Sequence, residues 1–405
     1  MNNNIILSDI LNHAIKTVPY YMNINENRHT YSLNDFPVVN KQIINEHYND
    51  FLSNKFNFYS DDIEIMSTTG SSGVYLKVLW RRVDRLYSDC YAWKARNRWY
   101  GISPTDKWIS FHSEVYAGNR LLNNDLKSDY IISKNLMSIN MKLLYDMNYE
   151  KIIDLIVKYN PKWMFGFPSI LNSIASYINN NNIHINGLEY IECMGEVLFP
   201  HVRANLSKAF CTAHVSNMYG STETGVIALE CPFGHMHILE QNCIVEVSPN
   251  NSLILTSLVN RIMPFIRYEI GDIAFVKNVE CKCGYNSLCI DELKGRNNDF
   301  VMLENNNCIS AMSLIHIFES LNDEFIDLIR SFIITQEKYD YFVVDMEINK
   351  KYYSWKDIII EKTKKKFCDF IKNNIYIDVN IHIMPIQIQK NTKFKFYINN
   401  IQKGV

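Results

Sequence analysis

Between residues 217 and 225 the sequence reads Asn-Met-Tyr-Gly-Ser-Thr-Glu-Thr-Gly, which gathers side chains able to hold a phosphate-bearing ligand. Tyr219 offers an aromatic face for stacking, and Gly220 lets the backbone pass close to a ligand. Thr222 can hydrogen-bond a phosphate oxygen, and the carboxylate of Glu223 can hold a hard cation such as Mg²⁺. An ordinary turn between a strand and a helix accounts for the same residues, so other segments must decide between these interpretations.

A second candidate is a loop built only of small hydroxyl residues and glycine, which follows the short apolar run at 64–66. Its residues are Ser67, Thr68, Thr69, Gly70, Ser71, Ser72 and Gly73. Such a loop presents backbone N–H groups and hydroxyls that suit phosphate oxygens. It lacks the Lys-Ser or Lys-Thr ending of the common nucleotide P-loop. A flexible surface loop fits the same composition.

Cysteine and histidine gather at two places that suit a metal ion. Cys231-Pro-Phe-Gly-His235-Met-His237 precedes Cys281-Lys-Cys283-Gly. Three thiolates and one imidazole would form a closed tetrahedral zinc site, which is structural because no coordination position stays open. The single residue between Cys281 and Cys283 is a tighter spacing than usual. Reduced core cysteines beside a surface histidine are the alternative.

Three further polar positions could line a binding site. His112 ends the strand predicted at 108–113 and could line a substrate pocket, although a structural histidine fits as well. Asp272 follows Gly271 at a bend, where a carboxylate can accept two hydrogen bonds from ribose hydroxyls or simply occupy a surface turn. Arg296 follows a glycine and suits a hinge with a cation aimed at a phosphate or ribose, so a domain boundary is predicted there.

Composition restricts the class of protein. A chain of 405 residues exceeds one core of typical size, so two domains are expected. With 47% hydrophobic and 21% charged residues it reads as a globular protein, and a net charge of -2 gives no electrostatic case for nucleic acid or an anionic membrane. Neither an 18-residue apolar run nor a signal peptide is present, which predicts a cytoplasmic protein. Five of its ten cysteines are then expected as reduced core residues: Cys90, Cys193, Cys211, Cys243 and Cys368.

The elements that must position these residues alternate between strand and helix in the first part of the chain. A helical stretch is predicted from Leu76 to about Tyr100, helical periodicity covers 141–160, and Pro168-Ser169 starts another helix. Strands are predicted at 108–113 and 188–193, the latter ending at Gly195 and Glu196. This alternation indicates a layered α/β domain.

Short alternating strands between 226 and 294 predict a small β-rich subdomain, which would carry the zinc site. Residues after 297 read as α+β, with strands at 333–335, 341–346 and 379–383 around a helix at 355–372. The predicted fold class is therefore α/β: a large N-terminal layered domain at 1–296 that includes the β-rich subdomain, and a small C-terminal α+β domain at 297–405.

The order of these segments resembles the adenylate-forming enzymes, which include acyl-CoA synthetases, adenylation domains and luciferases. The segments are a Ser/Thr/Gly loop, a Gly-Glu after a strand, Tyr-Gly-Ser-Thr-Glu, Arg-Tyr-Glu-Ile-Gly-Asp, Gly-Arg-x-x-Asp and a C-terminal lysine. Within that superfamily, the Phe-Gly-Phe-Pro-Ser segment at 165–169 and the Cys-Lys-Cys-Gly segment resemble the branch of phenylacetate–CoA ligases and CapK-like proteins. The resemblance covers nearly the whole chain.

The resemblance implies how ATP would be bound. The loop 67–73 would close over the β- and γ-phosphates, Tyr219 would stack on adenine, and Thr222 would touch the α-phosphate. Glu223 would hold Mg²⁺, and Asp272 would bind the ribose hydroxyls. The remaining nucleotide-binding positions would be Gly195, Glu196, Gly220, Ser221 and Arg296.

The resemblance also implies the other parts of the site. Gly195 would lie by the adenine and the acyl pocket, which His112 would also line. Lys393 matches a lysine that enters the site from a mobile C-terminal lid, so it would be catalytic together with the threonine and the glutamate of the first stretch. Similar family members have five residues between cysteine and histidine, which selects His237 rather than His235 as the zinc ligand.

The activity implied is the ATP-dependent activation of a small carboxylic acid as its acyl-adenylate, with release of pyrophosphate. An acid–thiol ligase would then pass the acyl group to coenzyme A or to the phosphopantetheine of a carrier protein. Transfer to an amine or a hydroxyl, as in antibiotic or surface-polysaccharide biosynthesis, is an alternative. A non-catalytic nucleotide-binding scaffold is another, because Val74-Tyr75, Asn298 and Thr392 depart from the family pattern.

Overall fold

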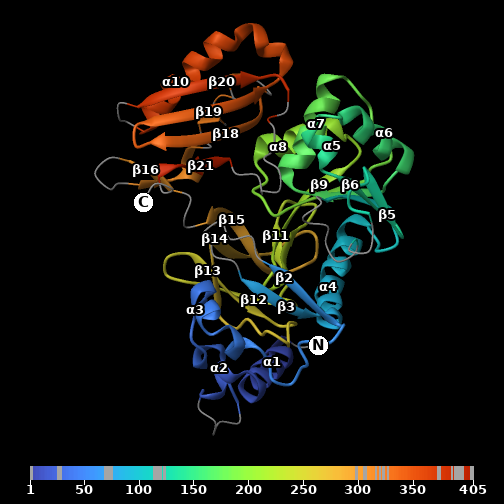
Figure 1. Ribbon diagram of the computed structural model, residues 1–405, viewed down its shortest axis with the longest axis vertical. Coiled ribbons are helices and arrows are strands. Elements are labelled where there is room, and N and C mark those ends of the chain that lie inside the picture. Colours follow the sequence, from blue (N-terminus) through green and yellow to red (C-terminus); the bar gives the residue numbers. More distant parts are fainter. Residues whose placement is uncertain are drawn as a thin grey trace. The chain divides into compact units, whose positions relative to one another are not determined.

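The computed structural model describes residues 3–24, 30–67, 76–112, 121, 125–296, 300–303, 308–314, 317–318, 321, 324–325, 328–371, 375–384, 386 and 396–401 (Figure 1). Contacts within the chain group it into two compact units. The first unit combines residues 1–104 with 216–297, and the second combines 105–215 with 298–405. The division predicted at 296/297 remains a prediction.

The first unit contains a mixed sheet made mostly of antiparallel neighbours. In spatial order its strands are β12 (Cys243–Val247), β13 (Ser252–Ser257), β14 (Tyr268–Val279), β15 (Ser287–Arg296), β11 (Met236–Ile238), β10 (Gly225–Glu230) and β9 (His214–Ser221). The short strand β1 (Val39–Asn40) pairs in parallel with β14. These strands confirm the predicted β-rich segment, because hydrophobic residues alternate along them and pack into one cluster.

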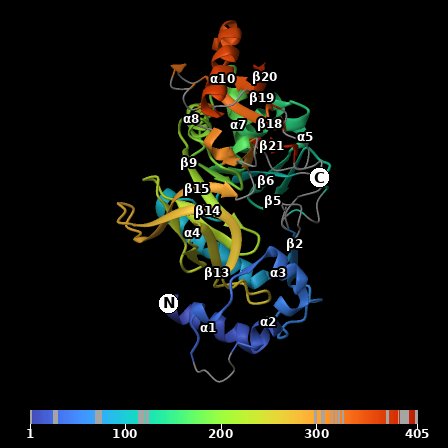
Figure 2. The ribbon, with the colours of Figure 1, turned by 90° about the vertical axis from the view of Figure 1, so that its left-hand side faces the viewer.

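Helices and a two-stranded ribbon complete this unit. They are α1 (Asn3–Thr17), α2 (Pro19–Met22), η1 (Leu33–Asp35), α3 (Lys41–Glu46), η2 (Tyr48–Phe51), β2 (Ile63–Ser67), β3 (Lys77–Arg81) and α4 (Arg82–Tyr100). Helix α4 packs against β10 and lies alongside the sheet in both views (Figures 1 and 2). It ends where Gly101 adopts the left-handed conformation that glycine tolerates best.

The prediction of helix from Leu76 onward is wrong over residues 77–81. These residues form β3, which pairs antiparallel with β2, and the helix begins only at Arg82. Val78, Leu79 and Trp80 are buried one after another, and the backbone hydrogen bonds to β2 favour the strand over the helical alternative.

The second unit contains the layered α/β part. Strands β8 (Tyr190–Met194), β7 (Trp163–Gly166), β4 (Trp108–His112) and β6 (Leu136–Asn140) are parallel neighbours, and β5 (Tyr130–Ser133) adds an antiparallel edge. The helices are α5 (Lys142–Tyr145), α6 (Tyr149–Tyr159), α7 (Pro168–Asn180) and α8 (Pro200–Ala209). The predicted alternation of strands and helices is confirmed here, including the helix start at Pro168, whose missing N–H is not needed in a first turn.

The same unit holds a small C-terminal sheet of four strands. Their order is β20 (Tyr376–His382), β19 (Tyr341–Ile348), β18 (Ile329–Lys338) and β21 (Tyr397–Asn399). The other C-terminal elements are α10 (Lys356–Ile371), β16 (Phe300–Met302), β17 (Cys308–Ser310), η4 (Ala311–Leu314) and η5 (Lys350–Trp355). Helix α10 covers this sheet (Figure 1) with its buried residues spaced four apart, as an amphipathic helix requires. No helix among the described residues is long and apolar enough to cross a membrane.

A buried polar group joins the C-terminal sheet to α7 and α8. Arg330 is only 1% exposed, and its guanidinium donates to Asn205 Oδ1 at 2.6 Å. Asn172 donates to the backbone carbonyl of Arg330 at 2.6 Å and accepts from Asn205 Nδ2 at 2.8 Å. Because buried polar groups cost free energy unless they are paired, these bonds favour one arrangement of the sheet on the helices.

Candidate active site

The Tyr-Gly-Ser-Thr-Glu stretch lies on a β-hairpin. β9 ends at Ser221, residues 222–224 form the turn, and Gly225 begins β10 opposite Ser221. The alternative of a turn between a strand and a helix is therefore wrong. A side chain on Gly220 would place its Cβ 2.9 Å from the carbonyl oxygen of Gly225, so the close pairing of the two strands requires glycine there.

The hairpin turn is held by hydrogen bonds on both sides. Within the turn, the backbone N–H of Thr224 donates to Ser221 Oγ at 3.1 Å. From β3, the indole of Trp80 donates to the carbonyl oxygen of Thr222 at 2.8 Å. These bonds define the backbone of the turn that carries Glu223.

Two hydrogen bonds between a phenol and a carboxylate connect the hairpin to β14. Tyr219 donates to Asp272 Oδ2 at 2.6 Å, and Tyr268 donates to Glu223 Oε1 at 2.9 Å. All four side chains are buried. The structure therefore pairs Tyr219 with Asp272, and Glu223 with Tyr268, at two points where the hairpin contacts β14.

Tyr268 was missed by the sequence reasoning. The signal for it was its place in the Arg-Tyr-Glu-Ile-Gly-Asp segment, four residues before Asp272. The hairpin that receives both side chains could not be deduced from that spacing.

The cysteines and the histidine of the predicted zinc site also lie together in the first unit. The ligand atoms of Cys231, His237, Cys281 and Cys283 all lie within 4.8 Å of one another. Cys231 Sγ is 3.7 Å from Cys281 Sγ, and Cys283 Sγ is 3.3 Å from His237 Nε2. Sulfur ligands of one tetrahedral zinc ion are about 3.8 Å apart, because a Zn–S bond is about 2.3 Å long. The donor set and its spacing therefore fit a tetrahedral zinc ion.

Two similar turns present the thiols. Gly234 and Gly284 each adopt a positive φ, and each donates its N–H to the carbonyl oxygen of the cysteine three residues earlier. The first turn links β10 to β11, and the second lies between β14 and β15. Because β11 pairs with β15, the two turns meet at one end of the sheet.

The sequence reasoning missed the residues on the far side of the imidazole. Ser287 Oγ lies 3.1 Å and Cys289 Sγ lies 3.2 Å from His237 Nδ1. An imidazole that coordinates through Nε2 carries its proton on Nδ1, so these atoms suit the position of an acceptor that orients the ring. Cys289 stands opposite His237 in the pairing of β11 with β15, and this register is not visible in the sequence.

Burial shifts the pKa of three of the four residues: it lowers that of His237 and raises those of Cys231 and Cys283. It lowers the pKa of His237 to about 4, so the imidazole is neutral near pH 7 and has a lone pair for a metal. It raises the pKa of Cys231 to about 12, so this thiol gives up its proton near neutral pH only when a cation compensates the thiolate.

In the second unit, the side chain of Glu196 reaches the first turn of α7. Its carboxylate accepts hydrogen bonds from Ser169 N and Ser169 Oγ, both at 3.0 Å, which suits an acidic group at a helix N-terminus. The preceding Gly195 has a φ of +76°, a conformation that favours glycine. Gly195 thus allows the chain to turn Glu196 toward the helix.

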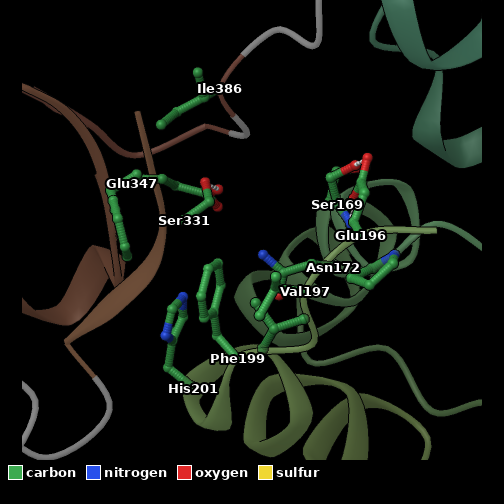
Figure 3. A pocket seen from close by; sticks show the side chains of 13 residues that line it. Ser169, Asn172, Glu196, Val197, Phe199, His201, Ser331, Glu347 and Ile386 are labelled. Carbon is green, nitrogen blue, oxygen red and sulfur yellow. Dashed lines mark hydrogen bonds between the residues drawn. The ribbon is translucent and has the colours of Figure 1, made fainter. Parts of the chain in front are cut away.

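A pocket opens between this segment and the C-terminal sheet. Figure 3 shows Ser331 and Glu347 on one side and the hydrogen-bonded pair of Ser169 and Glu196 on the other. Phe199 also lines it. Two of the lining residues are carboxylates, and no lysine or arginine is among the described residues that line the pocket.

His112 ends β4, as predicted, and is only 1% exposed. Its Nδ1 lies 3.0 Å from Ser138 Oγ, and burial lowers the pKa of the imidazole. It is not among the described residues that line the pocket in Figure 3. Its predicted role in a substrate pocket stays a prediction.

Several predicted residues lie outside the described part of the chain. They are Thr68, Thr69, Gly70, Ser71, Ser72, Gly73, Asn298 and Lys393. Ser67 ends β2 and Arg296 ends β15, but the side chains of these two residues are also outside the description. Their roles remain those implied by the resemblance.

A family model and one relative match parts of this chain. The family model described as AMP-binding enzyme matches residues 142–273. Protein CapK of Staphylococcus aureus is 26% identical over 265 residues, which cover 63% of this chain. The match spans 56% of CapK, little more than half of its length.

Solved structures share the fold at low sequence identity. The 2-hydroxyisobutyryl-CoA ligase in its postadenylation state with R3-HIB-AMP matches with a TM-score of 0.72 and 15% identity over 98% of this chain and 89% of that chain. The same ligase with 2-HIB-AMP and CoA in the thioesterification state gives a TM-score of 0.56 at 16% identity, over 97% and 88% of the chains. The anthranilate CoA ligase AuaEII with anthranoyl-AMP gives 0.53 at 12% identity, over 81% and 64%.

These structural matches show a mixed α/β fold with a small C-terminal sheet, as in adenylate-forming acyl-CoA ligases. The match to the family model covers the hairpin and the first residues of β14, which carry Tyr219, Glu223 and Asp272. Residues 142–273 thus match the AMP-binding enzyme family, and the chain is a distant homologue of CapK that shares the fold of adenylate-forming ligases.

Proposed function

We propose that this protein uses ATP and Mg²⁺ to activate a carboxylic acid as its acyl-adenylate, releasing pyrophosphate, and then passes the acyl group to a thiol. The observation that carries the proposal is that two buried hydrogen bonds, Tyr219 to Asp272 and Tyr268 to Glu223, join the hairpin to β14. These bonds fix the orientation of an aromatic face and two carboxylates. These are the groups that a nucleotide with a divalent cation requires.

The residues of this site have distinct tasks in the proposed reaction. Tyr219 would stack on the adenine, and its hydrogen bond to Asp272 would restrict the rotation of the ring. Asp272 would accept the ribose hydroxyls, and Thr222 would contact the α-phosphate. Fixing the nucleotide in this way reduces the entropy lost on reaching the transition state.

Glu223 would hold the magnesium ion. The donor fits this cation, because Mg²⁺ takes oxygen ligands and is usually held by one or two carboxylates together with substrate phosphates. When bound, Mg²⁺ would offset the charge of the phosphoryl oxygens that repel the attacking carboxylate. Lys393 would add a positive charge at the α-phosphate, delivered by movement of the C-terminal lid.

The acyl acceptor proposed first is coenzyme A or the phosphopantetheine of a carrier protein. Support comes from the shared fold with ligases whose structures hold acyl-adenylates and CoA. Phe165, Pro168 and the distant homology to CapK favour the branch of phenylacetate–CoA ligases and CapK-like proteins.

Transfer to an amine is a second candidate. The pocket that Glu196 lines is supported as a site for a cationic group, because Glu347 adds a second carboxylate across it. Glu347 is 1% exposed, and one of its oxygens has no hydrogen-bond partner among the described residues. An ammonium group would offer that oxygen a donor.

We also propose that Cys231, His237, Cys281 and Cys283 hold a structural zinc ion. The fit of three sulfur atoms and one imidazole nitrogen to a tetrahedral site supports this ligand set. With all four positions filled by protein, the ion would stabilise the fold rather than take part in the reaction.

The proposed reaction is tested by acid-dependent release of pyrophosphate from ATP by the wild type and by Glu223→Gln. The substitution keeps the shape of the side chain and removes its charge, so release should fall by at least about 100-fold, as for loss of a group that stabilises transition-state charge. Glu192→Gln is the matched control, because Glu192 is also buried and also accepts a phenol, that of Tyr190, at 2.8 Å. Equal rates for wild type and Glu223→Gln would contradict the proposed role.

A further inference from the structure

The hydrogen bond from Tyr268 to Glu223 gives one oxygen of the carboxylate a fixed partner. The phenol oxygen lies 2.9 Å from Glu223 Oε1, and both side chains are buried, at 1% and 4% exposure. A carboxylate on a rotatable stem can otherwise turn about its last bond. With Oε1 held by the phenol, Oε2 has a defined direction.

Tyr268 is itself held rigidly. It is the first residue of β14 and is paired on one side with Leu255 of β13 and on the other with Val39 of β1. Its ring packs edge-on against Phe265, with the centroids 5.2 Å apart. Because two neighbouring strands and an aromatic contact fix Tyr268, its hydrogen bond restricts the rotation of the Glu223 carboxylate.

We propose that Tyr268 is a positioning residue for the cation of the nucleotide site: it holds Glu223 Oε1 so that Oε2 faces the Mg²⁺ that accompanies ATP. This inference rests on the proposed function, in which Glu223 holds that ion. Tyr268 lies outside the residues that the sequence resemblance assigned to the site. Groups that orient a metal ligand typically contribute about 10- to 100-fold to metal affinity or activity.

The test compares the affinity for ATP with and without the cation. Isothermal titration gives the dissociation constant of ATP in excess Mg²⁺ and in excess EDTA, and their ratio measures how much Mg²⁺ tightens binding. Tyr268→Phe, which removes only the hydroxyl, should reduce this ratio by about tenfold and leave the affinity in EDTA unchanged. This readout does not depend on the identity of the acid or on turnover.

Two further variants show whether the effect passes through the carboxylate. In a Glu223→Gln background the added Tyr268→Phe substitution should change nothing, because the group it orients no longer binds the ion. Tyr190→Phe is the matched control, since it removes a buried phenol that donates to Glu192 and should leave the ratio at the wild-type value. If Tyr268→Phe does not fold, Phe265→Leu, which removes the ring contact that holds Tyr268, should lower the ratio and leave the affinity in EDTA unchanged, and an unchanged ratio would contradict the proposal.

The inference is wrong if Tyr268→Phe keeps the wild-type ratio, if it weakens ATP binding equally with and without Mg²⁺, or if its effect persists in Glu223→Gln. Failure of the proposed function looks different. In that case the wild type itself binds no ATP, or binds it equally well with Mg²⁺ and with EDTA, and the inference falls with it.

Discussion

Replacing Cys281 with serine should remove the bound zinc ion and lower the melting temperature of the protein by about 10 °C. The serine hydroxyl is a poor zinc ligand at neutral pH, so three donors would remain of the four that lie within 4.8 Å. The ion would no longer connect the turn after β10 to the turn after β14. The loss in free energy of unfolding can be worked out from the length of the loop that the zinc ion closes between these two turns.

Cys231 and Cys281 are 50 residues apart in the sequence. Closing a loop of that length in the unfolded chain costs about 4 kcal/mol of conformational free energy, which a cross-link removes from folding. For a unit of this size each kcal/mol corresponds to about 2–4 °C in melting temperature, which gives the expected shift of about 10 °C. Chelation of the wild type should have a similar effect, whereas the variant should not respond to a chelator.

The assay combines zinc content, measured by atomic absorption on the purified protein, with thermal unfolding before and after chelation. Cys193→Ser is the matched control, because Cys193 is also fully buried but lies outside the cluster. It should retain one equivalent of zinc even if it loses stability. A wild type with less than about a tenth of an equivalent of zinc, together with an equally stable Cys281→Ser variant, would refute the site.

The other predictions concern the nucleotide, the lid and acid stability. Asp272→Asn should weaken ATP binding in isothermal titration by about tenfold. The carboxylate that would accept hydrogen bonds from the ribose hydroxyls, and that accepts one from Tyr219, loses its charge in this variant. Unchanged affinity would contradict the role of Asp272. Lys393→Ala should abolish adenylation while ATP still binds, and full activity of this variant would show that Lys393 has no catalytic role in adenylation. Burial lowers the pKa of His201 to about 4, so its contribution to stability is present above its ordinary pKa of 6.5 and is lost as the pH falls from 6.5 toward 4. In urea unfolding, His201→Phe should therefore reduce the loss of stability between pH 7 and pH 5 by about 2 kcal/mol, and an identical loss would contradict the assignment.

The sequence predicted those features that depend on local pattern. The α/β alternation and the β-rich segment follow from hydrophobic periodicity and turn residues, and the structure confirms both. The four zinc ligands were chosen by residue type and spacing, and they do converge. Tyr219 and Asp272 form a hydrogen bond, whereas the roles that the order of motifs implied for them and for Glu223 stay predictions.

The sequence could not predict features that depend on pairing between distant strands. Residues 77–81 read as helix, yet they form a strand because β2 supplies its hydrogen-bond partners. Cys289 reaches His237 only through the register of β11 with β15. Tyr268 bonds to Glu223 although β15 and β11 separate β14 from the hairpin in the order of the strands. Local propensity contains no information on these contacts, which tertiary packing decides.

Exchange of labelled pyrophosphate into ATP with Mg²⁺, measured across a panel of aryl, aliphatic and amino acids, tests whether this protein forms an acyl-adenylate. Exchange requires a reversible adenylation step, so it reports the proposed reaction without knowledge of the acyl acceptor. The account predicts exchange that depends on one class of acid and is lost in Glu223→Gln. Protein that binds ATP but shows no exchange with any acid of the panel would contradict it and would favour a nucleotide-binding scaffold.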